Sequence, residues 1–268
     1  MKVAICFYGL TRSLRFTQKS IHKNLIDPVK NNYETIIYGH FFDVKNISNP
    51  RSFEENIIVT GDYDLINFDQ MTLEQPDRFI GASFYKDVCQ YGDTWKDECR
   101  SIKNLFHQLY SLNKVYSLTK SYNPDIIIFA RPDLQYHDDF SALMQEISSN
   151  VEKNLAYIPN WQSFGGFNDR FAVAKGKLAA DAIGNRYTKM LDYCQSANES
   201  IHSEKLLKYS LTNESIKIFH HNLRASRIRS NGIRAKESFR DGFIGKVDAN
   251  FRYFKDLLSI KYLGGIEY

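Results

Sequence analysis

Residues 125–136, DIIIFARPDLQY, constrain the fold more than any other part of this sequence. Three consecutive isoleucines and a phenylalanine predict a strand that is buried on both faces, which is typical of a parallel sheet covered by helices on both sides. Pro132 cannot continue the pairing of a central strand, so we expect the strand to end near Arg131. Arg131 and Asp133 are then presented at its carboxyl end.

Helical and strand-like patterns alternate along the rest of the chain. Apolar residues recur at helical spacing over residues 101–122, and Asn123-Pro124 is expected to end that helix, because the residue before proline disfavours the α region. Further strands are predicted at residues 2–8, 35–38, 155–159, 170–174 and 216–219, and further helices near residues 13–25, 176–193 and 204–211. Residues 44–100 are expected to hold short strands and long loops.

This alternation predicts one α/β domain with a mostly parallel central sheet flanked by helices. We expect the domain to span residues 1–235. Residues 236–268 form a basic, aromatic tail, which we expect to pack on the domain.

Composition and charge exclude several classes of protein. Hydrophobic residues make up 43% and charged residues 25% of the 268 residues, which excludes a disordered or fibrous chain. An excess of 35 basic over 31 acidic residues is too small for a dedicated nucleic-acid-binding protein. The four cysteines form no CxxC pair, and no stretch approaches the ~18 apolar residues of a membrane-spanning helix. We therefore expect a cytoplasmic protein, with at most a peripheral contact of its tail with the membrane.

Polar residues follow the predicted strands at their carboxyl ends, which is the edge where open α/β sheets bind ligands. The candidates there are Gly9, Thr11 and Arg12 after the first strand, His40 after the second, and the turn that holds Arg131 and Asp133. A glycine lets a ligand approach the backbone closely, and the start of the next helix offers N–H donors to a phosphate. The alternatives are an ordinary strand–helix turn and a structural ion pair between Arg131 and Asp133.

The order of the motifs resembles that of a known family. CFYGLTRS, IIYGHFFD, a helix with Gln108 and Ser111, YNPDIIIFARPDL, NDRFAVA and SEKLLKYSL follow one another as in glycosyltransferases of bacterial and viral surface-polysaccharide clusters, which resemble the type-A nucleotide-diphosphosugar transferase (GT-A) fold. The resemblance spans about residues 1–235. It implies a Rossmann-type domain that transfers a sugar from a nucleotide-diphosphate donor, with UDP favoured, to a hydroxyl of a glycan or lipid-linked glycan in surface polysaccharide or lipopolysaccharide synthesis. Galactofuranosyl transfer is one activity within this family.

The resemblance also implies roles for individual residues. Gly9, Thr11 and Arg12 would line the nucleotide pocket together with His40 and Gln108. Asp169 would face the acceptor, and Glu204 matches the catalytic carboxylate of inverting members. Glu204 also suits the first turn of a helix through the helix dipole alone.

The motif that usually holds a metal differs in this chain. Its two aspartates normally bind Mn²⁺ or Mg²⁺ against the diphosphate, but Arg131 replaces the first of them. Asp133 alone remains as a metal ligand, while the guanidinium of Arg131 can bind a diphosphate directly. Four further arginines, among them Arg227 and Arg229, surround a Ser-Asn-Gly turn and could clamp the leaving diphosphate. The arginines favour a metal-independent reaction, with Mn²⁺ or Mg²⁺ at Asp133 as the alternative.

An inverting transfer needs a carboxylate to deprotonate the acceptor hydroxyl as it attacks the anomeric carbon. Glu204 is the first candidate for this base and Asp169 the second. Trp161, Phe164 and Phe167 are expected to stack on the faces of the acceptor sugars.

Two other functions stay open at this point. One is a sugar-phosphate nucleotidyltransferase, and the other is a non-catalytic glycan-binding module. In the latter, Arg131, Asp133 and Glu204 would not meet in one cleft.

Overall fold

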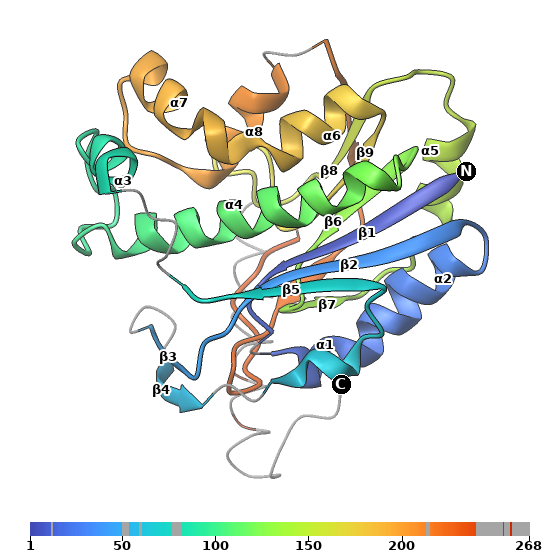
Figure 1. Cartoon of the computed structure of the whole chain (residues 1–268), viewed down its shortest axis with the longest axis horizontal. Helices are drawn as coiled ribbons and strands as arrows, with labels where there is room; N and C mark the ends of the chain where they lie inside the picture. The colour runs from blue at the N-terminus through green and yellow to red at the C-terminus, as the bar shows by residue number, and fades with distance from the viewer. Residues whose placement is uncertain are drawn as a thin grey trace.

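A seven-stranded sheet forms the centre of the molecule, and helices cover both of its faces (Figure 1). The computed structural model describes residues 1–11, 13–49, 54–58, 61–76, 82–212 and 215–239, together with residues 254 and 258. The strand order is β10-β8-β9-β6-β1-β2-β5. The bounds of these strands are β1 (Lys2–Gly9), β2 (Glu34–Phe42), β5 (Gln70–Glu74), β6 (Ile126–Ala130), β8 (Leu155–Pro159), β9 (Ala172–Lys175) and β10 (Lys217–His221).

All neighbouring strands of the sheet are parallel except β9, which runs antiparallel to both β6 and β8. The predicted α/β class with a mostly parallel central sheet is therefore confirmed. Two antiparallel two-stranded sheets of the described residues lie outside this sheet. They are β3 (Asn46–Asn49) with β4 (Glu54–Ile58), and β7 (Leu134–Tyr136) with β11 (Ala225–Arg227).

Helices lie on both sides of the sheet. α1 (Leu14–Ile21) continues through a π-helical turn, His22–Ile26, into α2 (Asp27–Lys30). The other helices are α3 (Ala82–Cys89), α4 (Arg100–Leu118), α5 (Ser141–Ser149), α6 (Lys177–Gly184), α7 (Met190–Ala197) and α8 (Ser203–Thr212). In Figure 1, α4, α6, α7 and α8 lie on one side of the sheet, with α1 and α2 on the other. None of the helices within the described residues combines the length and apolar character that spanning a bilayer requires.

The alternation of side chains in β1 separates two hydrophobic cores. Val3, Ile5 and Phe7 pack with the residues of α1 and the helical turn that follows it. Ala4, Cys6 and Tyr8 pack on the opposite face, with α4. β6 is likewise buried along its whole length, as its run of isoleucines predicts. Since a fully buried apolar side chain of this size contributes about 1.5–3 kcal/mol, these two central strands fix the sheet on which the site is built.

The predicted long helix is present and ends in the expected place. α4 ends at Leu118 and is followed by a 3₁₀ turn, Thr119–Ser121. Asn123 then adopts a left-handed conformation with φ 49°, which is a common way for a helix to end, and Pro124 follows it. The packed apolar face of α4 leaves its polar face toward the carboxyl edge of the sheet.

The prediction for residues 35–38 is too short, because β2 continues to Phe42. Gly39 does not end the strand. It lies inside β2, where a Cβ atom would come within 2.8 Å of the ring of Phe41 and 3.1 Å of that of Phe68. His40 is consequently a buried residue within the strand and does not follow its carboxyl end.

Two other predictions differ from the structure in their detail. The strand predicted at residues 170–174 begins two residues later, as β9. Residues 44–100 hold the helix α3 in addition to short strands and loops.

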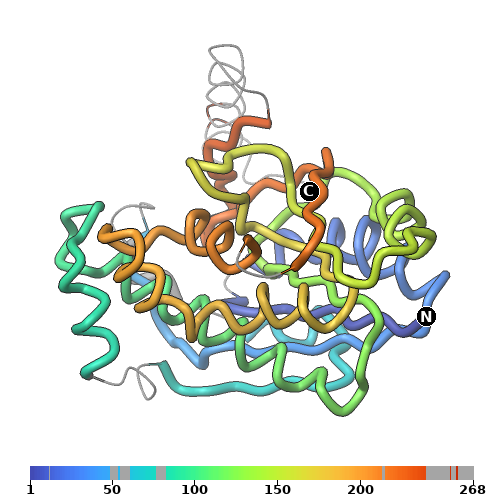
Figure 2. The backbone as a smooth tube through the Cα atoms, turned by 90° about the horizontal axis from the view of Figure 1, so that it is seen from above, coloured from blue at the N-terminus to red at the C-terminus, as the bar shows by residue number. Residues whose placement is uncertain are grey.

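The C-terminal part of the described chain lies beside the loop of residues 160–170 (Figure 2). The ring of Trp161 contacts that of Phe239, and Arg170 lies near Glu237. Arg12 and most of the predicted tail, residues 240–253, 255–257 and 259–268, lie outside the described residues. The division at residue 235 stays a prediction.

Candidate active site

A cavity of about 790 Å³ opens at the carboxyl ends of β1, β2 and β6. The sheet changes direction at β1, since β2 lies on one side of it and β6, which comes later in the chain, on the other. Such a switch point is where open α/β sheets bind ligands. The cavity also takes residues from the first turns of α4, the start of α8 and the segment that follows β11.

Nine of the predicted site residues line this cavity: Gly9, Gln108, Arg131, Asp133, Phe164, Asp169, Glu204, Arg227 and Arg229. They come from six separate parts of the chain, and the fold brings them together. Arg131, Asp133 and Glu204 in particular meet in one cavity.

His40 and Thr11 are not among the lining residues. His40 is buried, with its Nδ1 2.9 Å from the hydroxyl of Ser111 and its Nε2 3.3 Å from Glu74. Burial lowers the pKa of His40 and outweighs the opposing effect of Glu74. Ser111 also accepts a hydrogen bond from the amide of Gly9 and donates one to the carbonyl of His40, so it joins β1, β2 and α4 beneath the cavity.

Two of the three predicted acceptor-binding aromatic residues also lie outside the cavity lining. Trp161 is 3% exposed and packs edge-on against Phe239, and the ring of Phe167 packs against that of His220. Phe164, which is 57% exposed and has φ 44°, does line the cavity.

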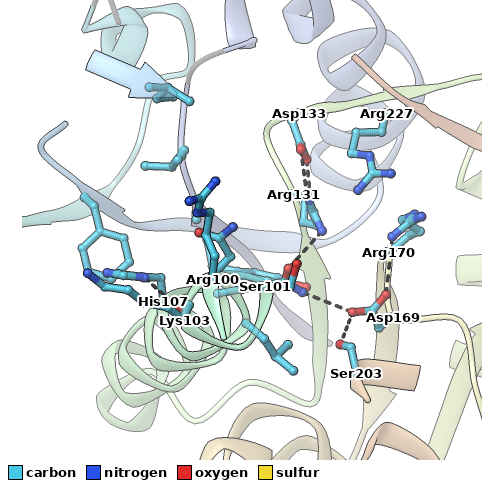
Figure 3. A pocket seen from close by; sticks show the side chains of 18 of the residues that line it. Arg100, Ser101, Lys103, His107, Arg131, Asp133, Asp169, Arg170, Ser203 and Arg227 are labelled. Carbon is cyan, nitrogen blue, oxygen red and sulfur yellow. Dashed lines mark hydrogen bonds and ion pairs between the residues drawn. The ribbon is translucent and has the colours of Figure 1, made fainter. Parts of the chain in front are cut away.

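Arg131 and Asp133 form a bidentate ion pair at the end of β6 (Figure 3). Arg131 Nε donates to Asp133 Oδ1 at 2.9 Å, and Nη2 donates to Oδ2 at 2.7 Å. Burial disfavours the charged guanidinium, but the Asp133 carboxylate outweighs that effect and raises the pKa of Arg131. Nη1 of Arg131 also donates to Gln108 Oε1 at 3.2 Å, which links the pair to α4.

This arrangement does not fit a divalent cation at Asp133. Both carboxylate oxygens of Asp133 accept hydrogen bonds from Arg131, so a guanidinium stands where a cation would have to bind. Mn²⁺ and Mg²⁺ require several oxygen ligands. Within the part of the chain that the structure describes, no cluster of three or more His, Cys, Asp or Glu side chains has the arrangement of a metal site.

Asp169 is a buried carboxylate held by donors on several sides. Gln108 Nε2 donates to its Oδ2 at 3.2 Å, the Ser203 hydroxyl donates to the same oxygen, and Arg170 Nη1 lies 3.6 Å from Oδ1. Burial alone would raise the pKa of Asp169, but Arg170, the Ser203 hydrogen bond and Arg186 hold it below its usual value. Asp169 therefore stays ionised and is a weak base.

The pairing of β7 with β11 carries Arg227 to the cavity. Arg227 lies opposite Leu134 in this antiparallel pair, and the amide of Ile228 donates to the carbonyl of Asp133 at 2.8 Å. Beyond β11 the chain turns at residues 230–232, and Ala235 donates back to the carbonyl of Arg227 at 2.7 Å. The predicted Ser-Asn-Gly turn thus lies directly behind the cavity.

Arg227 is half-buried, and the charges around its guanidinium are not fully balanced. Burial, and then the charges of Arg170 and Arg229, lower the pKa of Arg227 well below its usual value, against the opposing charge of Glu237. Its Nε has no hydrogen-bond partner among the described residues. A cation in this condition is costly unless an anion meets it, so the arrangement favours an anionic ligand at this position.

Glu204 lies in the first turn of α8 with its carboxylate facing His202. Glu204 Oε2 is 3.2 Å from His202 Nδ1, and the Glu204 side chain is 11% exposed. This hydrogen bond raises the pKa of His202, although burial opposes it. The ring of Trp95 stacks on that of His202, with centroids 6.0 Å apart and planes inclined by 20°.

Several lining residues are absent from the sequence predictions. Arg100, Lys103 and His107 recur at helical spacing on the face of α4 that also carries Gln108, and that spacing is readable in the sequence. Arg170 adjoins Asp169 and could have been found with it. Trp95 and His202 show no pattern that marks them as site residues, because loops place both of them.

The lining is strongly biased toward positive charge. Among the described residues it holds six Arg or Lys side chains against three Asp or Glu side chains. The cations are Arg100, Lys103, Arg131, Arg170, Arg227 and Arg229, and the anions are Asp133, Asp169 and Glu204. A low-dielectric cavity of this kind concentrates anionic ligands.

No protein-family model matches the chain, and no curated protein matches it. Solved structures similar to it include the galactosyltransferase LgtC in complex with donor and acceptor sugar analogues, at 11% identity and a TM-score of 0.45, covering 83% of this chain and 73% of that chain. The apo glycosyltransferase GlyE of Streptococcus pneumoniae TIGR4 has 13% identity and a TM-score of 0.43, covering 82% and 45%. A Bacillus anthracis protein named as a glucose-1-phosphate thymidylyltransferase, in complex with a sucrose, has 9% identity and a TM-score of 0.40, covering 85% and 89%. At these identities and scores, the likenesses establish nothing about the activity of this chain.

The contact between the 160–170 loop and α8 yields a testable prediction. A Cβ atom on Gly166 would lie 2.1 Å from the carbonyl carbon and oxygen of Glu204, whereas at Gly165 the nearest atom is Lys205 Cε at 3.7 Å. Gly166→Ala must displace the first turn of α8, and we expect it to cost about 3 kcal/mol of unfolding free energy, at the upper end for overpacking. Gly165→Ala should lower the unfolding free energy by only about 1 kcal/mol, because alanine disfavours the left-handed backbone conformation there. Equal losses for the two variants in urea unfolding would contradict the close contact.

Proposed function

We propose that this protein is a glycosyltransferase of the GT-A type that moves a sugar from a nucleotide-diphosphate donor to a hydroxyl of a glycan acceptor. The observation that carries the proposal is the meeting of Arg131, Asp133, Arg227 and Glu204 in one cavity at the switch point of the sheet. The order of sequence motifs supports the same reaction. A non-catalytic glycan-binding module would not require this convergence.

The arginine cluster, which comprises Arg131, Arg170, Arg227 and Arg229, is proposed to bind the diphosphate of the donor (Figure 3). Negative charge develops on the diphosphate as its bond to the sugar breaks, and fixed cations in a site with little water stabilise that charge. Arg227 supports this role most directly, because it is a cation whose neighbours are mainly other cations. We favour a UDP-sugar as the donor.

Glu204 is proposed to be the general base, with Asp169 positioning Gln108, which in turn accepts a hydrogen bond from Arg131. The acceptor oxygen forms a bond to the anomeric carbon, the bond from that carbon to the diphosphate oxygen breaks, and the hydroxyl proton passes to Glu204. Asp169 is less suited to accept the proton, because its pKa is held low by Arg170 and Ser203. The reaction we propose is therefore inverting.

The reaction is proposed to need no metal ion. Arg131 engages both oxygens of Asp133, and the surrounding cations can neutralise the diphosphate. We place the reaction in surface polysaccharide or lipopolysaccharide synthesis on the cytoplasmic side of the membrane, with a glycan or lipid-linked glycan as acceptor.

A donor-hydrolysis screen tests the proposal. We expect the protein to hydrolyse at least one of a panel of UDP-, GDP-, CMP- and dTDP-sugars slowly, and to keep full activity in EDTA. Hydrolysis of none of them would contradict the glycosyltransferase, and loss of activity in EDTA would contradict metal independence. A parallel reaction with a nucleoside triphosphate and glucose 1-phosphate, followed by pyrophosphate release, identifies a nucleotidyltransferase instead.

Removing the proposed base should lower the rate of turnover without changing the affinity for the donor. Glu204→Gln keeps the size of the side chain and abolishes its proton affinity, so turnover should fall by about 100- to 10,000-fold. Glu199→Gln is the matched control, since Glu199 pairs with Lys205 and does not line the cavity. Affinity for the nucleoside diphosphate should change little in either variant. Unaltered turnover in Glu204→Gln would exclude Glu204 as the base.

The contact between His202 and Glu204 predicts the pH dependence of the reaction. The hydrogen bond with Glu204 raises the pKa of His202 above its ordinary value of about 6.5. Below that raised pKa the imidazolium pairs with Glu204 and occupies the carboxylate that must accept the proton, so kcat/KM should increase as pH rises through the pKa of His202. The same ion pair stabilises the fold below about pH 6.5, and that stabilisation is lost as His202 deprotonates.

The His202→Gln variant provides the control for this pH profile. Gln keeps a hydrogen-bond donor beside Glu204 but does not titrate, so the inflection above about pH 6.5 should disappear. Retention of the same inflection in the variant would assign it to another group.

A further inference from the structure

We propose that Glu237 is a counter-anion of the arginine cluster, which shares these cations with the diphosphate and so limits the affinity of the site for it. This inference rests on the proposed function and adds a positioning residue to the same site. Glu237 belongs to the segment that follows β11 and does not itself line the cavity.

The carboxylate of Glu237 is buried against two residues of the arginine cluster. Its side chain is only 1% exposed, and Oε1 lies 3.4 Å from Arg170 Nε. Oε2 accepts a hydrogen bond of 2.7 Å from the amide of Arg227. The charge of Glu237 also opposes the lowering of the Arg227 pKa by burial and by the neighbouring arginines. One side chain therefore pairs with the first of these arginines and holds the backbone of the second.

Contacts on both sides of Glu237 fix the position of its carboxylate. Before it, the amide of Ala235 donates to the carbonyl of Arg227 at 2.7 Å. After it, the ring of Phe239 packs edge-on against that of Trp161, with centroids 4.9 Å apart. We therefore expect Glu237 to stay beside Arg170 when a ligand binds.

The carboxylate and a bound diphosphate would meet the same cations from different sides. Arg170 and Arg227 line the cavity, whereas Glu237 does not (Figure 3). A diphosphate reaches the two arginines from the cavity, and the carboxylate contacts them from behind. Like charges repel, and water and salt screen this repulsion little in a buried site, so Glu237 opposes the binding of the diphosphate.

This opposition suits an enzyme that must release a nucleoside diphosphate after each transfer. Fixed cations stabilise the charge that develops on the diphosphate in the transition state, but they also bind the released product. Binding that is equally strong before and during the reaction does not accelerate the chemical step. Glu237 therefore keeps the arginines in place between turnovers and limits how tightly the product is held.

Calorimetric titration of the whole protein with UDP tests this proposal. Glu237→Gln keeps an oxygen that can accept the amide of Arg227 and removes the negative charge. We expect UDP to bind about three- to tenfold more tightly to this variant, where tenfold corresponds to about 1.4 kcal/mol. The midpoint of its urea unfolding should fall, because Arg170 loses a counter-charge. A purely structural contact predicts instead that UDP binding weakens together with the unfolding midpoint.

Glu152→Gln is the matched control for the charge. Glu152 pairs with Lys217 and does not line the cavity, so its substitution should leave the affinity for UDP unchanged. If Glu237→Gln does not fold, Arg170→Gln/Glu237→Gln removes one charge of each sign and is compared with Arg170→Gln alone. The same gain in UDP affinity is expected in that comparison.

Unchanged or weaker UDP binding on removal of the Glu237 charge would overturn the proposal. Failure of the unaltered protein to bind UDP would instead contradict the proposed function. In that case inorganic pyrophosphate replaces UDP in the same comparisons and still tests the role of Glu237, and the absence of pyrophosphate binding to every variant would overturn that role as well.

Discussion

The mutual neutralisation of buried arginines and carboxylates at the carboxyl edge of the sheet is the interaction on which the site depends. Arg131 and Asp133 are both mostly buried, and removal of one member of such a pair leaves a charge that costs about 3–5 kcal/mol. Gln108 joins this pair to Asp169 by donating to one and accepting from the other. The network therefore holds β6, α4 and the loop before β9 in one arrangement before any substrate binds.

Next to this network, the guanidinium of Arg227 lacks a full set of hydrogen-bond partners among the described residues. This unpaired positive charge determines which ligands the site can bind. Arg227 and Arg170 share Glu237, whose buried carboxylate lies 3.4 Å from Arg170 Nε and accepts the amide of Arg227. Asp169 also lies near Arg170, whereas the Nε of Arg227 has no hydrogen-bond partner among the described residues. An anionic ligand would meet this unpaired donor, in line with the diphosphate binding that we propose. The segment after β11 contributes Arg229 to the lining of the cavity.

How far the sequence predicts this structure depends on whether a residue's position is set locally. β1 and β6 are predictable because burial on both faces demands uninterrupted apolar runs, and Pro132 marks the end of β6. The pairing of β7 with β11 cannot be predicted from the sequence. Each of these strands has only three residues and therefore shows no periodicity, and the rest of the fold brings the two strands together. That pairing places Arg227, whose role the sequence suggests only through local charge. Trp161 lies close to the site residues in the sequence, which led us to expect it in the cavity. Its ring instead packs against that of Phe239, a contact that the sequence does not reveal.

The packing of helix α4 in the core fixes the positions of the polar side chains on the same helix. Ile102, Leu105 and Phe106 are buried against the sheet, so the rotation of the helix about its axis is fixed by packing. A turn of about 100° would be needed to move each polar residue to its neighbour's position, and it would expose this apolar face. The separation between Gln108 at the arginine cluster and Arg100 at the opposite end of the cavity is therefore a property of the core.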